Sequence, residues 1–124
     1  MAFSSTKFDR AVSFKVLHDA NITNAVQKNV TGGPGMLPSV KIVNGNDAAV
    51  YVKLFNEYSA NEGTTAPDWV LSCPATSTYT YEIPGGVLYK ALTVCATENG
   101  IPSDNTAPSV SGNETIAVTI VTSV

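Results

Sequence analysis

The side chains that most often do chemistry are few in this chain and stand far apart. There is one histidine, His18, and there are two cysteines, Cys73 and Cys95. A structural zinc site needs about four His or Cys ligands at short spacing, and a Ser-His-Asp triad needs a histidine beside its nucleophile. We therefore expect no catalytic residue, no metal site and no cofactor, and we interpret His18 as structural.

The charged residues point to no ligand either. The carboxylates are dispersed, and Glu57, Glu62 and Asp68, which share one loop, lack the alternating oxygen ligands of a calcium loop. Lys and Arg total seven and are scattered, in a chain of net charge −3. Nucleic-acid binding needs a basic stripe that displaces counterions. The sequence thus predicts a protein that is neither an enzyme nor a nucleic-acid binder.

Composition favours strands over helices. Charged residues make up only 14% of the chain, below the usual quarter, and neutral polar residues replace them, with 14 Thr, 11 Ser and 10 Asn. Thr suits the wet face of a sheet, and Asn and Ser suit turns. With 124 residues, the chain is long enough for one domain with a core and too short for two.

Apolar periodicity predicts an antiparallel β-sandwich, jelly-roll or immunoglobulin-like, of about six to eight strands. Alternation or short apolar runs predict strands at residues 12–16, 26–30, 39–43, 48–56, 69–73, 78–83, 90–97 and 115–122. Pro84-Gly85-Gly86 predicts a turn after the sixth of these, because Pro presets φ and Gly accepts positive φ.

One turn signal is stronger than the others. Asn44-Gly45 stands between two alternating runs and predicts an antiparallel hairpin over residues 39–56, because both residues accept positive φ. Three residues of its second strand would face the core, namely Val50, Val52 and Leu54. The residues between them, Tyr51 and Lys53, would face the other side, as would Phe55.

No segment predicts export or membrane insertion. The N-terminus lacks an apolar signal-peptide core, and no apolar run approaches the roughly 20 residues that span a bilayer. We expect synthesis and retention in a host cytoplasm. Since disulfides are rare in reducing compartments, we interpret Cys73 and Cys95 as buried free thiols.

Several segments, taken in order, resemble a family of small virion proteins of tailed bacteriophages. The resemblance covers roughly residues 26–124, and the matching segments are residues 28–35, 44–56, 63–69, 83–86 and 91–95. A second glycine, expected near Lys90-Ala91, is missing. The resemblance implies a β-sandwich module, without catalytic residues, that attaches to a head or a tail.

From this resemblance we expect a capsid decoration or cement protein located in the virion. Residues 1–25 would form an extended arm that reaches along a neighbour, and residues 26–124 the sandwich domain. Its partners would be the major capsid protein and copies of itself, as a homotrimer or another symmetric cluster, without nucleic acid or membrane. Removing residues 1–20 would then weaken attachment without unfolding the body.

An alternative is a tail or fibre-associated module that binds host-surface glycans. Aromatic rings can stack on sugar faces, and the loops at residues 57–68 and 98–113 are long enough to carry a site. Tyr58 and Trp69 are the candidate binding residues. The competing interpretation of the aromatic residues is that they fill the core and make protomer contacts.

Overall fold

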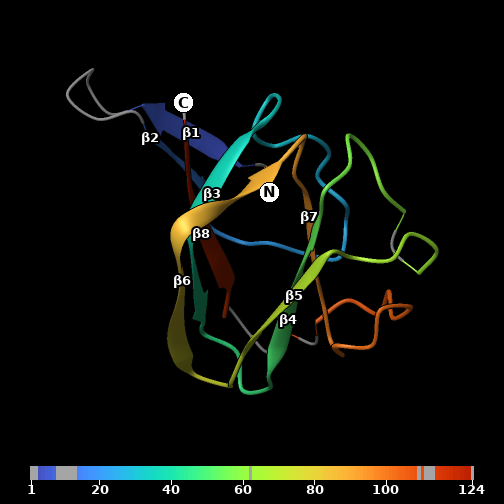
Figure 1. The fold of residues 1–124 in the computed structure, drawn as a ribbon. Coiled ribbons are helices and arrows are strands. Elements are labelled where there is room, and N and C mark those ends of the chain that lie inside the picture. The colour runs from blue at the N-terminus through green and yellow to red at the C-terminus, as the bar shows by residue number, and fades with distance from the viewer. Residues whose placement is uncertain (1–2, 8–13, 62, 109, 111–113, 124) are drawn as a thin grey trace.

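The predicted all-β fold is confirmed by a computed structural model that describes residues 3–7, 14–61, 63–108, 110 and 114–123. These residues contain no helix and form two antiparallel sheets (Figure 1). The eight strands are β1 (Ser4–Lys7), β2 (Phe14–Asp19), β3 (Gly35–Asn44), β4 (Val50–Phe55), β5 (Trp69–Cys73), β6 (Ser77–Tyr89), β7 (Thr93–Thr97) and β8 (Ile116–Ser123).

The two sheets enclose the main core. The larger sheet has the strand order β1-β2-β8-β3-β6, and the smaller one has the order β5-β4-β7. Strand β8 shows why they stack, since its residues alternate between buried and half-buried along its whole length. Burial of one face removes apolar area from water at about 25 cal/mol per Å². Among the most buried residues are Val40, Ile42, Val50, Val52, Leu54, Val118 and Ile120.

The predicted hairpin over residues 39–56 is wrong, because its two strands belong to different sheets. Strand β3 pairs with β6 and β8, whereas β4 pairs with β5 and β7. Gly45 does not take a positive φ, and its amide instead donates to the carbonyl oxygen of Thr115, 3.0 Å away. The chain therefore crosses from one sheet to the other at this point. The prediction that Val50, Val52 and Leu54 face the core is confirmed.

Asn44 holds this crossing in place. Its side chain is buried, and its Nδ2 lies 2.8 Å from the carbonyl oxygen of Ala48, 3.2 Å from that of Cys73 and 3.0 Å from that of Pro74. Its Oδ1 accepts a hydrogen bond from the Asn46 amide at 3.0 Å. One amide thus ties the residues after β3 to those between β5 and β6.

The predicted turn at residues 84–86 is also wrong, because β6 continues through it. The register of β6 against β3 shifts between Leu37 and Ser39, so the extra residues form a bulge. Gly85 and Gly86 have φ angles of 80° and 73°, which glycine tolerates best. The Pro and the bulge also disrupt the outer edge of β6, which discourages pairing with another chain.

The segment predicted as a strand at residues 26–30 covers the edge of β7. Gln27 and Val94 form an isolated antiparallel bridge, with backbone hydrogen bonds of 2.9 and 3.0 Å in the two directions. The amide of Ala96 donates to the Thr23 carbonyl at 3.0 Å, and that of Val30 donates to the Leu92 carbonyl at 2.8 Å. This edge of the smaller sheet is therefore closed within the chain.

The prediction that residues 1–25 form an arm outside the sandwich is wrong for the described part of that segment. Strand β2 pairs with β8 from Phe14 to Asp19, and β1 pairs with β2. Leu17 and Asp19 are buried, and the backbone amide of Phe3 donates to Gln27 Oε1 at 3.0 Å. The reason is the register of β2 against β8, which places Leu17 opposite Ile120 and Asp19 opposite Val118 on the inner face of the larger sheet.

We predict that deletion of residues 1–20 destabilises the whole domain. It would remove two strands, expose the edge of β8 and forfeit about 2 kcal/mol for the burial of Leu17 alone. The expected result is a large fall in Tm, or loss of a cooperative transition, in thermal unfolding followed by circular dichroism.

Deletion of residues 1–7 is the matched control, because it removes only the edge strand β1 and leaves β2 paired with β8. We expect a smaller fall in Tm for this variant. A truncation at residue 20 that unfolds at the same temperature as the full chain would show that β2 adds nothing to the fold.

Candidate functional site

The outer face of the smaller sheet carries a second, smaller core. Phe55, Cys95 and Ala60 are buried together there, with Val26 packed against them. Residues 56–61, 63–68 and 98–108 belong to the loops on this side of the molecule, and these loops lie side by side at the right of Figure 1. The smaller sheet is therefore covered on both faces. Lys53 and Phe55 do face away from the main core, as the sequence predicted, but the loops bury them.

Lys53 is the most unusual residue on this face, because it is a cation that is only 1% exposed. On the neighbouring strands its register partners are Val70 and Cys95. Its Nζ donates to the carbonyl oxygens of Ile101 and Asp104, both at 2.7 Å. A buried charge is tolerated only where such partners replace water, so Lys53 fixes the loop at residues 98–106 onto the sheet.

The Asp104 carboxylate organises the same loop from within. Desolvation raises the pKa of Asp104, but hydrogen bonds from the Thr106 hydroxyl and the amides of Asn99 and Thr106, with the charge of Lys53, outweigh it and hold this pKa below its usual range. The Asp104 Oδ2 lies 3.1 Å from the Asn99 amide nitrogen, and Oδ1 lies 2.9 Å from Thr106 Oγ1. The arrangement closes a compact turn rather than presenting a free carboxylate.

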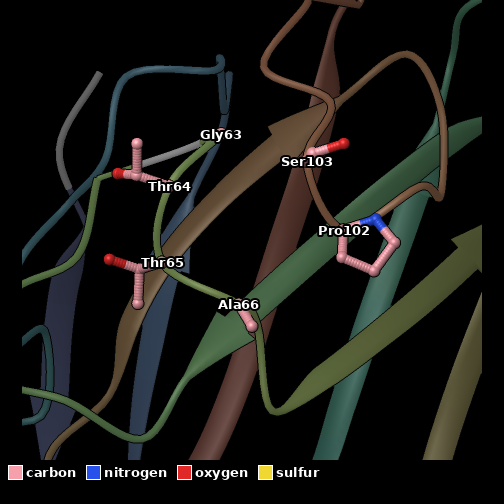
Figure 2. Close-up of a pocket in the computed structure, with 6 residues that line it drawn as sticks. All are labelled: Gly63, Thr64, Thr65, Ala66, Pro102 and Ser103. Carbon is pink, nitrogen blue, oxygen red and sulfur yellow. The ribbon is translucent and has the colours of Figure 1, made fainter.

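A small pocket opens between the two loops on this side. It has a volume of about 140 Å³ and is lined by Gly63, Thr64, Thr65, Ala66, Pro102 and Ser103 (Figure 2). These residues offer hydroxyl groups and small apolar surfaces, and none of them is ionisable. The pocket has the dimensions of a packing gap between two loops, since sites for small molecules usually enclose about 300–1,000 Å³.

The two candidate glycan-binding residues do not line this pocket. Tyr58 follows β4 and is 56% exposed, so its ring is accessible. Trp69 begins β5, is half-buried and packs against the main core. Of the other aromatic residues, Phe55 and Tyr89 are buried, which confirms the core interpretation for those two. Glycan binding by Tyr58 and Trp69 stays a prediction.

Both cysteines are buried, as predicted. Cys73 lies opposite Val50 on the inner face of the smaller sheet, and Cys95 lies opposite Lys53 on its outer face. A disulfide between them would have to pass through the sheet. Burial raises the pKa of the Cys73 thiol, against a weaker lowering by the amides of Tyr79 and Asn44.

The outer face of the larger sheet has a different character. The outward residues of β2, β3, β6 and β8 are all exposed or half-buried, and Val43 is 39% exposed. Register places Val16, Val121, Ser39 and Glu82 in one row across this face and His18, Thr119, Lys41 and Thr80 in the next. His18 Nδ1 lies 2.8 Å from Thr119 Oγ1. We call these eight residues and Val43 the open face.

No protein-family model, curated protein sequence or solved structure matches the chain. Within the described residues, no three His, Cys, Asp or Glu side chains are grouped so that they could hold a metal ion. The same part of the chain has no helix long and apolar enough to cross a membrane.

Sequence reasoning missed both buried polar anchors, Lys53 and Asn44. Lys53 carried one usable signal, because it stands between Tyr51 and Phe55 on the same side of its strand. Two aromatic side chains on the outer face of this strand indicate that another part of the chain covers that face. Asn44 carried a misleading signal, since an asparagine before a glycine usually marks a hairpin turn.

We predict that Lys53→Met lowers the free energy of unfolding by about 2–4 kcal/mol, because the partly buried carbonyls of Ile101 and Asp104 would lose their charged donor. Urea unfolding would measure the loss, and hydrogen exchange would show faster exchange across residues 98–106. Lys41→Met is the control, because Lys41 is exposed on the open face, and it should change stability by less than about 0.5 kcal/mol. Equal effects would contradict the anchoring role.

We also predict that Cys73 makes stability fall at alkaline pH. Its folded pKa is raised, so its contribution is complete below the ordinary thiol pKa of 9.0 and is lost as pH rises through the folded value. Urea unfolding of the parent chain and of Cys73→Ala at neutral and alkaline pH measures this. Cys73→Ala should be less stable throughout and show a shallower alkaline decline, whereas an identical slope would exclude the thiol as its source.

Proposed function

We propose that this chain is a non-enzymatic structural protein of a tailed-phage virion, and that it serves as a capsid decoration or cement protein. The ordered resemblance of residues 26–124 to small virion proteins suggests the class of particle. The open face is the observation that carries the proposal, because it offers a broad surface to a partner.

The size of this surface suits a protein partner. Four strands spaced about 4.8 Å apart, over about eight residues at 3.3 Å each, give a face of roughly 500 Å². Specific interfaces bury about 800 Å² on each partner, so the open face with its rim approaches the size that stable attachment needs. It also presents the exposed apolar side chain of Val43.

The charge of the open face favours protein over DNA. Its ionisable residues are Lys41, Glu82 and His18, so formal charges nearly cancel. A DNA-binding face would instead gather several Lys and Arg side chains against the phosphates. A shell of major capsid protein is the partner that the proposal assigns to this face.

Self-association would use the strand edges. Strands β1 and β5 end the two sheets, and among the described residues each has one edge without a neighbouring strand. Pairing of such edges between copies would close them and build the symmetric cluster expected of a decoration protein, with a homotrimer as the assembly proposed here.

The test is quantitative mass spectrometry of purified particles of the encoding phage, separated into heads and tails. A copy number comparable with the major capsid protein, in the head fraction, is the expected result. A small symmetric number in the tail fraction would favour the glycan-binding alternative with Tyr58 and Trp69. Absence from both fractions would overturn the virion assignment.

A pair of variants tests the open face itself. Val43→Glu places a charge on this face, and Ile101→Glu places the same charge on an exposed residue of the loop at the other side of the molecule. Both should keep the parent Tm. We expect Val43→Glu alone to reduce binding to undecorated heads, and equal binding by both variants would remove the open face as the attachment surface.

A further inference from the structure

The chain contains two Asn-Gly steps, Asn44-Gly45 and Asn99-Gly100, and the fold places them in opposite environments. Asn44 is buried at the crossing between the sheets, whereas Asn99 is exposed in the loop after β7. Asn-Gly is the dipeptide most prone to spontaneous deamidation, because glycine has no side chain to hinder attack by its own backbone nitrogen. The two steps therefore form a matched pair within one molecule.

We propose that Asn99 is a site of spontaneous deamidation in the folded protein, and that the fold protects Asn44 from the same reaction. The Gly100 nitrogen attacks Asn99 Cγ, a new C–N bond forms, and the Cγ–Nδ2 bond breaks. The proton of the Gly100 amide leaves with the side-chain nitrogen as ammonia. Water then opens the cyclic imide, at Cγ to give aspartate or at the backbone carbonyl to give isoaspartate.

Every group that would react at Asn44 is held. Its Nδ2, the leaving group, lies within 3.2 Å of three carbonyl oxygens, and its Oδ1 accepts from the Asn46 amide. The Gly45 nitrogen, the attacking group, donates to the Thr115 carbonyl at 3.0 Å. Ring closure would break these bonds and turn the buried Asn44 side chain out of its hydrogen-bonded position, so it is disfavoured although Gly45 itself is exposed.

The reacting groups at Asn99, its side-chain amide and the Gly100 nitrogen, are not held by such hydrogen bonds. Only its backbone is held, by the amide bond to Asp104 Oδ2 at 3.1 Å and by Thr97 Oγ1, which donates to its carbonyl oxygen at 2.7 Å. Within the described residues, neither the Asn99 side chain nor the Gly100 nitrogen makes a hydrogen bond. The exposed side chain is also open to the water that the second step consumes.

The product would disturb the loop that Lys53 anchors. Isoaspartate adds a methylene to the backbone between residues 99 and 100. Gly100 packs so tightly on the Tyr51 ring that an added Cβ would lie 3.0 Å from Tyr51 Cδ2. The lengthened backbone cannot keep this contact together with the Thr97 bond and the two carbonyl contacts to Lys53. We therefore expect residues 98–106 to open in the isoaspartate form.

The experiment is ageing of the folded, full-length protein at mildly alkaline pH, followed by tryptic mass spectrometry. Cleavage after Lys41, Lys53 and Lys90 places Asn44 in the peptide 42–53 and Asn99 in the peptide 91–124. Fragment spectra separate Asn99 from the other amides of that peptide, and isoaspartyl methyltransferase labelling detects the isoaspartate product. The expected result is time-dependent deamidation at Asn99, with Asn44 at the level of the unaged sample.

The chain aged in denaturant is the control, and there both Asn-Gly steps should react at comparable rates. An Asn99 that keeps its amide in the folded protein while it reacts in the denatured chain would overturn the proposal. Equal reaction at Asn44 and Asn99 in the folded protein would overturn the protective role of the Asn44 hydrogen bonds.

Hydrogen exchange of the aged protein tests the consequence. Residues 98–106 should exchange faster after ageing, while aged Asn99→Gln, which cannot close the five-membered imide ring, should match its unaged sample. Unchanged exchange in a sample rich in isoaspartate would overturn the predicted opening of the loop.

Discussion

The side-chain amide of Asn44 lies within hydrogen-bond distance of three backbone carbonyl oxygens, and the path of the chain between the two sheets depends on it. The crossing from β3 to β4 leaves backbone groups that no strand can pair. Buried backbone groups without hydrogen-bond partners are costly. A polar side chain must therefore supply the hydrogen bonds that a neighbouring strand would otherwise make. Because β3 and β4 then lie in separate layers, their apolar faces can meet across one core.

Lys53 is a second buried polar side chain that fixes chain segments in place. It binds a loop to the smaller sheet, whereas Asn44 binds the crossing between the two sheets. Lys53 points out of the smaller sheet, where two carbonyl oxygens from the loop after β7 receive its ammonium group. Phe55, Cys95 and Ala60 supply the apolar cover beside it. The smaller sheet is thus sandwiched between a main core and a loop layer, while the larger sheet keeps one face open. This asymmetry supports the proposal of a single attachment face.

The sequence predicted the strands better than their partners. Alternation located the inward face of β4 correctly, because burial of one face imposes a period of two on any sheet. The same alternation says nothing about which strand lies alongside. The hairpin at Asn44-Gly45 and the turn at residues 84–86 were therefore predicted from local turn chemistry alone. At Asn44-Gly45 the tertiary structure overrode that chemistry, whereas Gly85 and Gly86 take the expected positive φ within a bulge instead of a turn. A strand was predicted at residues 12–16, but nothing in the polar start of the chain indicated that β1 and β2 belong to the larger sheet.

The sequence by itself determined the class of this protein, an all-β domain with little charge. Those features depend on residue types and short spacings, which act before any long-range contact forms. Only the tertiary structure decided the pairing of strands, the burial of Lys53 and Asn44, and the face that stays open. Each of these depends on groups far apart in the chain, such as Lys53 and Asp104, whose desolvation and hydrogen bonding exist only once the layers have met.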